Sequence, residues 1–249
     1  MTTPFLITAR LKSTRLPKKV MLEVMGKPLI VHMLDRIKFS KYIEDIVICT
    51  STNSQDDLLE EIAEKEHVRC FRGSEEDVLG RLLGAAKHYD MANFANITAD
   101  CPLIDPQLID RAIEEYDKEN ADLVMYDGSN NNIPFNCYVL KVSALEKVCE
   151  LKKETDTEIW LNILTNHRSF KIHSIIVEDK YRHSSLKTSL DYPEDYEFMK
   201  EIFDKLYNPD RIFSLLDVID LVNRRPDILA INANPELLKR WRAHQISAP

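Results

Sequence analysis

Short apolar runs alternate with amphipathic stretches through the first half of the chain. Runs typical of buried strands lie at residues 5–9, 46–50, 68–71, 94–99 and 123–126. Between them, apolar residues recur at helical spacing at residues 29–37, 58–63, 78–89 and 107–116. This alternation predicts an α/β fold, with a mostly parallel sheet and helices on both of its faces. Ligands of such sheets bind beyond the carboxyl ends of the strands, so we expect the segments after residues 9, 71 and 99 to face one cleft.

The second half of the chain is less regular. Strands are predicted at residues 138–141 and 171–177, and helices at residues 144–151, 158–166, 213–223 and 235–241. Pro193 suits the first turn of a further helix, and residues 127–132 are typical of a turn-rich loop. We find no internal repeat or low-complexity linker. The sequence therefore predicts one domain over residues 1–249, with a smaller inserted or trailing lobe.

Composition and charge exclude several classes of protein. The chain has 33 Lys and Arg against 41 Asp and Glu, a formal charge of −8, which argues against a broad nucleic-acid surface. Its five glycines form neither of the common glycine-rich nucleotide fingerprints. The five cysteines are never spaced C-x-x-C, the first thirty residues hold no signal-peptide core, and no apolar run could span a bilayer. We expect a soluble, cytoplasmic protein without membrane contact.

A cluster of cations follows the first predicted strand. The segment Arg10-Leu-Lys-Ser-Thr-Arg-Leu-Pro-Lys-Lys holds five cations and two hydroxyls within ten residues. A charge run of this kind can be a solvated loop. At the carboxyl end of a strand it also suits a polyphosphate, because arginine forks grip phosphate oxygens and lysine adds charge.

Aspartates follow two further extended segments. Asp105 precedes a proline and is best explained as a helix N-cap, whereas Asp100 precedes no helix directly and is the better functional candidate. Asp191 ends an extended stretch, while Glu194 and Asp195 fall in a helical first turn, where the helix dipole explains them. Asp100 and Asp191 beside a cationic loop suit Mg²⁺, which takes carboxylates together with phosphate oxygens. Without a metal between them, we expect the two carboxylates to repel and one to stay protonated.

These three segments together resemble a known family. Arg10-x-x-Ser13-x-Arg15-Leu-Pro-x-Lys19, Asp100-x-Pro-Leu and Leu-Asp191-x-Pro-Glu-Asp are similar to the motifs of CTP-dependent sugar cytidylyltransferases. The loop at residues 73–81 and the tail at residues 213–232 resemble the spore-coat-polysaccharide branch, which is related to the 3-deoxy-manno-octulosonate cytidylyltransferases.

The resemblance implies a Rossmann-like nucleotidyltransferase fold and a reaction. CMP would pass from CTP to an acidic sugar or a phosphorylated small molecule, with release of pyrophosphate, for surface polysaccharide or glycoconjugate precursors. It also implies a homodimer and a Mg²⁺ cofactor held by Asp100 and Asp191. The implied catalytic residues are Arg10, Arg15, Lys19, Asp100 and Asp191. The implied nucleotide-binding residues are Ala9, Arg10, Ser13, Arg15, Lys19, Arg72, Gly73, Ser74, Ala99 and Asp100.

The chain departs from the family pattern at three places. Lys18 and Ala99 stand where the family usually has glycine, and Glu158-Ile159 stands where a Glu-His pair is expected. Residues 134–164 match poorly, so we predict an acceptor-binding or dimerisation lobe within residues 132–180.

Two alternative functions remain open. A nucleotide-sugar glycosyltransferase would usually carry Asp-x-Asp after a strand, and Asp100-Cys-Pro lacks the second aspartate. The other alternative is a non-catalytic nucleotide-binding subunit, which would not need both Asp100 and Asp191.

Overall fold

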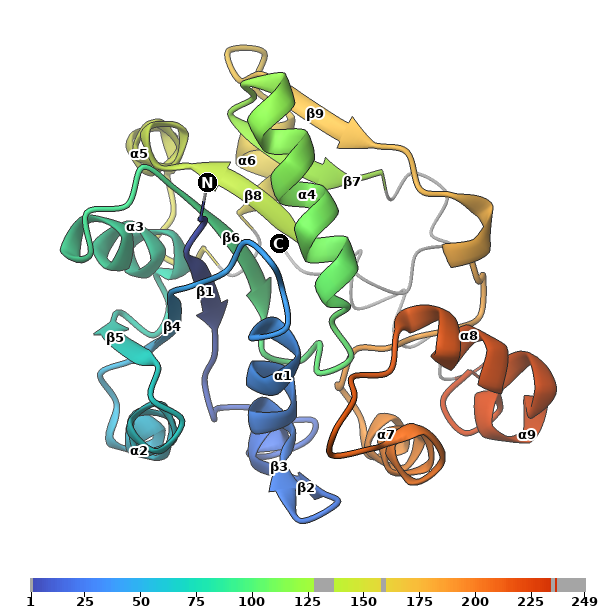
Figure 1. The fold of residues 1–249 in the computed structure, drawn as a ribbon. Coiled ribbons are helices and arrows are strands. Elements are labelled where there is room, and N and C mark those ends of the chain that lie inside the picture. The colour runs from blue at the N-terminus through green and yellow to red at the C-terminus, as the bar shows by residue number, and fades with distance from the viewer. Residues whose placement is uncertain (1, 128–136, 158–159, 234–235, 237–249) are drawn as a thin grey trace.

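A seven-stranded sheet runs through the chain in the computed structural model, which describes residues 2–127, 137–157, 160–233 and 236 (Figure 1). The strand order is β5-β4-β1-β6-β8-β7-β9. The strands are β1 (Phe5–Thr8), β4 (Ile46–Ser51), β5 (Arg69–Gly73), β6 (Asn93–Thr98), β7 (Leu123–Tyr126), β8 (Tyr138–Lys141) and β9 (Ile172–Ile175).

All strands of this sheet except β8 run in the same direction. Phe5 of β1 pairs in parallel with Ile46 of β4 and with Ala95 of β6. β8 is antiparallel to both β6 and β7, and β9 is again parallel to β7. The predicted mostly parallel α/β fold is confirmed.

Helices cover both faces of the sheet and build two hydrophobic cores. Residues alternate between the faces along each central strand: Phe5 and Ile7 enter one core and Leu6 enters the other. The first core is covered by α1 (Leu29–Ile37), α2 (Asp57–Lys65), α4 (Pro106–Glu119), α7 (Pro193–Leu206), α8 (Leu215–Arg224) and α9 (Pro226–Leu229). The second core is covered by α3 (Val78–His88), α5 (Val142–Leu151) and α6 (Leu161–Thr165).

A small hairpin, which the sequence pattern does not predict, follows the cationic segment. It joins β2 (Glu23–Val24) to β3 (Lys27–Pro28), and its two turn residues have positive φ, 49° at Met25 and 75° at Gly26. Two positive φ values are what a two-residue turn of the I′ type requires. Single 3₁₀ turns complete the described elements: η1 (Lys19–Met21), η2 (Ser54–Asp56) and η3 (Asp179–Tyr181).

The irregular second half contributes to the same sheet. Within residues 132–180, the described parts supply β8 and β9 to the sheet and α5 and α6 to its cover, while an acceptor-binding or dimerisation role stays a prediction. The helix predicted at residues 235–241 and most of the loop at 127–132 lie outside the described residues.

All five cysteines are free thiols. None of the described helices is long and apolar enough to cross a membrane.

Candidate active site

A cavity of about 340 Å³ opens beyond the carboxyl ends of β1 and β6. The cationic segment after β1 and the turn after β6 supply most of its lining, and α3, β8 and the start of α6 supply the rest. The lining residues are Thr8, Ala9, Arg10, Lys12, Ser13, Thr14, Arg15, Lys19, Val20, Val78, Arg81, Thr98, Ala99, Asp100, Tyr138 and Trp160. This is the edge at which an open α/β sheet binds its ligands.

Buried contacts fix the cationic segment at its start. The carboxylate of Asp56, which is fully buried, accepts hydrogen bonds from the backbone N–H of Leu11 (2.7 Å) and from the hydroxyl of Ser51. Farther along, Lys12 forms an ion pair with Glu75 at 3.4 Å, which ties the segment to the loop after β5. The contacts with Asp56 and Glu75 therefore fix the start of the segment beside the cavity, although part of the segment is exposed.

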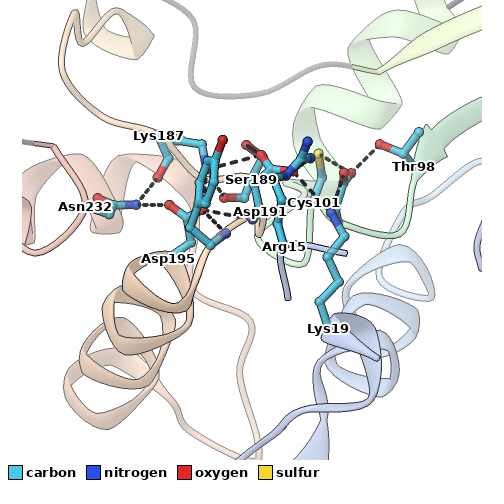
Figure 2. Close-up of polar contacts among 11 residues, drawn as sticks. Arg15, Lys19, Thr98, Cys101, Lys187, Ser189, Asp191, Asp195 and Asn232 are labelled. Atoms are coloured by element: carbon cyan, nitrogen blue, oxygen red, sulfur yellow. Dashed lines mark hydrogen bonds and ion pairs between the residues drawn. The ribbon is translucent and has the colours of Figure 1, made fainter. Parts of the chain in front are cut away.

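Lys19 joins the two candidate aspartates. Its Nζ lies 3.2 Å from Oδ2 of Asp100 and 3.2 Å from Oδ1 of Asp191. Arg15 Nη2 lies 3.1 Å from the same Oδ1 of Asp191, although the two residues are 176 positions apart in the sequence (Figure 2). The backbone N–H of Leu190 donates to the carbonyl of Asp100 (2.8 Å), which holds the two aspartate-bearing segments side by side.

Both aspartates have further partners. The hydroxyl of Thr98 donates to Oδ1 of Asp100. Oδ2 of Asp191 accepts from the hydroxyl of Ser189 at 3.1 Å and lies 3.2 Å from Nζ of Lys187. Thus each carboxylate has one oxygen on Lys19 and the other on a neighbour of its own segment.

The charge state of this cluster differs from the sequence-based expectation. Burial alone would raise the pKa of Asp191, but Lys19 and Lys187 outweigh burial and hold that pKa well below its usual value. Burial would likewise lower the pKa of Lys19, but Asp100 and Asp191 outweigh it and raise that pKa. Asp191 is therefore not a carboxylate that stays protonated, because the Lys19 ammonium lies between it and Asp100 and the Lys187 ammonium contacts its other oxygen.

Comparison with known proteins identifies the family. The sequence pattern of the cytidylyltransferase family matches residues 5–203. The chain belongs to this family. It is therefore a nucleotidyltransferase, and the resemblance stated from its three motifs is confirmed.

Individual relatives agree with this assignment. The chain is 28% identical to the spore coat polysaccharide biosynthesis protein SpsF of Bacillus subtilis, over 90% of this chain and 95% of that protein. It is 37% identical to the 3-deoxy-manno-octulosonate cytidylyltransferase of Chloroherpeton thalassium, over 47% of this chain and 46% of that protein. A solved cytidylyltransferase structure from Leptospira borgpetersenii superposes with a TM-score of 0.82 at 30% identity, covering 92% of this chain and 97% of that one.

The cavity of this cytidylyltransferase brings together most of the residues that the motifs indicated. Arg72 is not among its lining residues: its guanidinium contacts Asp57 and Glu60 of α2, each at 2.7 Å. Gly73 and Ser74 lie behind the lining, against Arg81. A side chain at Gly73 would meet Cγ of Arg81 at 3.1 Å, and Arg81 donates to the carbonyl of Ser74. The lining residues among those predicted are Ala9, Arg10, Ser13, Arg15, Lys19, Ala99 and Asp100. Asp191 does not line the cavity but contacts Arg15 and Lys19, which do.

The second half of the chain anchors the loop after β5. Asp77 caps α3 by accepting from the backbone N–H of Gly80 (2.9 Å), and it also accepts from Lys152 and from the hydroxyl of Thr157 (3.0 Å). Thr157 Oγ1 in turn accepts from the backbone N–H of Leu79 at 2.9 Å. Since Trp160 follows shortly after, the same segment reaches both the loop and the cavity wall.

Sequence reasoning missed Lys187 and Asn232. Lys187 is 3% exposed, and Asn232, from the segment after α9, is 1% exposed. A lysine between Leu186 and Leu190, in an otherwise apolar and hydroxyl-bearing stretch, was the available signal. Nothing in the local pattern of Asn232 marks it, because its partners lie in distant segments.

Proposed function

We propose that the protein transfers CMP from CTP to an acidic sugar or a phosphorylated small molecule and releases pyrophosphate. One observation carries the proposal. Arg15, Lys19 and Asp100 line one sheet-edge cavity, and Asp191, from a third segment far along the sequence, contacts Arg15 at 3.1 Å and Lys19 at 3.2 Å. This arrangement supplies cations for a triphosphate and carboxylates for a divalent cation at the same place.

The similarity to SpsF supports precursors of a surface polysaccharide or glycoconjugate as the product class.

The cavity also has an uncharged wall. Val78, Tyr138 and Trp160 line it, and the indole of Trp160 packs edge-on against the ring of Tyr138 with centroids 5.4 Å apart. Aromatic surface of this kind suits the apolar face of a sugar ring, so we assign the acceptor to this wall.

The five free thiols fit the cytoplasm, which we propose as the compartment of the protein.

The reaction needs positioning and charge neutralisation. An acceptor oxygen attacks the α-phosphorus of CTP in line, the new P–O bond forms as the α–β bridging P–O bond breaks, and the electron pair leaves with pyrophosphate. A sugar hydroxyl releases its proton to solvent, whereas a phosphate oxygen attacks as the anion. Arg10, Arg15 and Lys19 bind the triphosphate and take up the charge that develops on the leaving pyrophosphate. No covalent intermediate with the protein is required.

The aspartate pair fits Mg²⁺ by its donor set. Both groups are carboxylates, and Lys19 Nζ already sits between them at 3.2 Å from each, so this position suits a cation. Asp100 and Asp191 would hold the ion, which when bound neutralises charge on the reacting phosphate. Arg15 and Lys19 would then exchange their aspartate contacts for phosphate oxygens.

Pyrophosphate release tests the proposal. The purified chain is incubated with CTP, Mg²⁺ and one acceptor from each of three classes: an octulosonate, a nonulosonate and a phosphate-bearing small molecule. We expect release with one class, and faster release with CTP than with ATP, GTP or UTP. Equal turnover of ATP, or no CTP-dependent release with any class, would contradict the proposal.

We also propose a homodimer, by analogy with the family. Light scattering at micromolar protein should give about twice the chain mass of 28.9 kDa, and a mass near 28.9 kDa would contradict it.

A further inference from the structure

The two oxygens of Asp191 have different kinds of partner. Oδ1 contacts Arg15 and Lys19, which belong to the cationic segment. Oδ2 contacts Lys187 and Ser189, which belong to the stretch that leads into Asp191 itself. The proposed function draws the first pair toward a triphosphate and leaves the second pair in place. Oδ1 is thus the oxygen with exchangeable partners, and Oδ2 is the anchored one.

Lys187 is more deeply buried than the two loop cations that contact Asp191. Its side chain is 3% exposed, against 13% for Lys19 and 31% for Arg15. Besides Asp191, its Nζ forms an ion pair with Asp195 and donates to the carbonyl of Ser189 at 2.9 Å. Asp195 is fixed in turn, because its Oδ2 accepts from the backbone N–H of Asp191 (2.8 Å) and of Tyr192 (2.9 Å).

Asn232 closes this network from the carboxyl-terminal side. Its Nδ2 donates to the carbonyl of Lys187 at 3.1 Å and to Oδ1 of Asp195 at 3.0 Å. Figure 2 shows the resulting row of contacts from Asn232 through Asp195 and Lys187 to Asp191. The first turn of α7 and the segment after α9 therefore both contact Lys187, which in turn contacts Asp191.

We propose that Lys187 is a positioning residue of the CMP transfer: it holds Asp191 through Oδ2 when Arg15 and Lys19 leave Oδ1 for the triphosphate. The inference rests on the proposed function. An unanchored carboxylate would turn toward the departing cations, whereas Lys187 keeps Oδ1 directed at the cation position beside Asp100. Hydrogen-bonded partners of this kind orient metal ligands in proteins generally.

Charge balance alone predicts the opposite result for the same substitution. Lys187 Nζ lies 3.2 Å from Asp191, so it repels any divalent cation that Asp191 binds. If the lysine only neutralised Asp191 and Asp195, its removal would tighten metal binding. A positioning role requires that removal weaken it.

Mn²⁺ binding in the presence of CTP and without acceptor separates the two cases. Bound Mn²⁺ is measured by electron paramagnetic resonance for the wild-type chain, Lys187→Met and Lys187→Arg. Lys200→Met is the matched control, because Lys200 pairs with Glu197 on the exposed face of α7. We expect Lys187→Met to weaken Mn²⁺ binding by about tenfold or more, with Lys187→Arg restoring most of it. Unchanged or tighter Mn²⁺ binding in Lys187→Met would overturn the proposal.

A second variant keeps the test decisive if Lys187→Met does not fold. Asn232→Ala removes the tether and leaves every charge of the cluster in place, so we expect Mn²⁺ binding to weaken by about threefold or more. A lowered melting temperature with unchanged Mn²⁺ binding would show that the network is structural only. A wild-type chain that binds Mn²⁺ with CTP but releases no pyrophosphate would contradict the proposed function and not the positioning role. Absence of Mn²⁺ binding by the wild type would overturn both.

Discussion

Lys18 occupies a backbone conformation that a side chain disfavours. Its φ is 52° and its ψ 30°, the left-handed region in which glycine is unstrained. We expect Lys18→Gly to raise the free energy of unfolding by about 0.5–1 kcal/mol, measured by urea denaturation. Gly26→Ala, at φ 75°, is the reverse control and should lower it. A Lys18→Gly protein less stable than the wild type would contradict this account of the loop.

Arg15 reaches the cavity with a planar guanidinium. We expect Arg15→Ala to raise the apparent KM for CTP about tenfold to a hundredfold, since a charge-assisted hydrogen bond contributes about 1.5–3 kcal/mol. Arg15→Lys should recover only part of this loss, because lysine lacks the fork. Steady-state kinetics with varied CTP measures both variants, and Lys27→Ala, on a surface pair with Asp35, is the control. If Arg15→Ala had the kinetics of the wild type, the cationic segment would be a solvated loop and not a phosphate-binding one.

Asp191 links the site to stability. Its pKa is held below the usual carboxyl value by Lys19 and Lys187 in spite of burial, so the folded chain binds fewer protons there than the unfolded chain. The stabilisation is therefore fully present above the unfolded pKa of about 3.9 and is lost as the pH falls through the lowered value.

Asp191→Asn should accordingly lower the free energy of unfolding at pH 7 by about 1–3 kcal/mol, since Lys19 and Lys187 lose their shared partner. The difference from the wild type should shrink as the pH falls below about 4. Thermal melts at pH 7 and pH 3 measure it. A difference that is the same at both pH values would show that the ion pairs do not set it.

At the scale of elements, Asp105 serves two helices. It caps α4 as the sequence predicts, accepting from the backbone N–H of Gln107 at 2.9 Å. Its second oxygen accepts from the backbone N–H of Leu215, at the start of α8, at 2.7 Å.

We expect Asp105→Ala to lower the free energy of unfolding by about 2–4 kcal/mol, more than a single cap contributes, because two backbone N–H groups, of which that of Leu215 is buried, lose their acceptor. Ser214→Ala, which removes a cap of α8 alone, is the matched comparison by chemical denaturation. Equal losses in the two variants would contradict the double role of Asp105.

Local pattern predicts the elements, and contact between distant segments decides the rest. The apolar runs of β1, β4 and β6 are visible in the sequence because both faces of a parallel strand are buried. The reversal of β8 and its place between β6 and β7 are not, since the sequence does not state which strand pairs with which.

The same division holds within the site. Asp100 could be singled out because it ends a strand and caps no helix. Asp195 was assigned to the helix dipole, and only the fold shows that it is buried against Lys187 and Asn232. Arg72 lies near the carboxyl end of β5, and its side chain contacts Asp57 and Glu60 of α2, which the motif does not encode.

At the scale of the molecule, the chain folds so that its amino-terminal loop and its middle turn line one cavity, and Asp191 of its late extended segment contacts Arg15 and Lys19 of that lining. α7, α8 and α9 lie together at one end of the sheet, and the stretch that leads into α7 delivers Asp191 (Figure 1). Lys19 of the amino-terminal loop contacts both Asp100 and Asp191 in the folded chain. The proposed mechanism therefore requires the two aspartates to act as one site.

A double-mutant cycle on these two residues is the most direct test of that claim. Asp100→Asn, Asp191→Asn and the double variant are compared by kcat/KM for CTP-dependent pyrophosphate release, with Asp204→Asn on the surface of α7 as control. Each single substitution should lower the value by about a hundredfold or more, and the double variant should fall within about threefold of the weaker single one, because both changes disable the same site. Losses that multiply in the double variant, or near-normal activity in Asp191→Asn, would contradict the shared site.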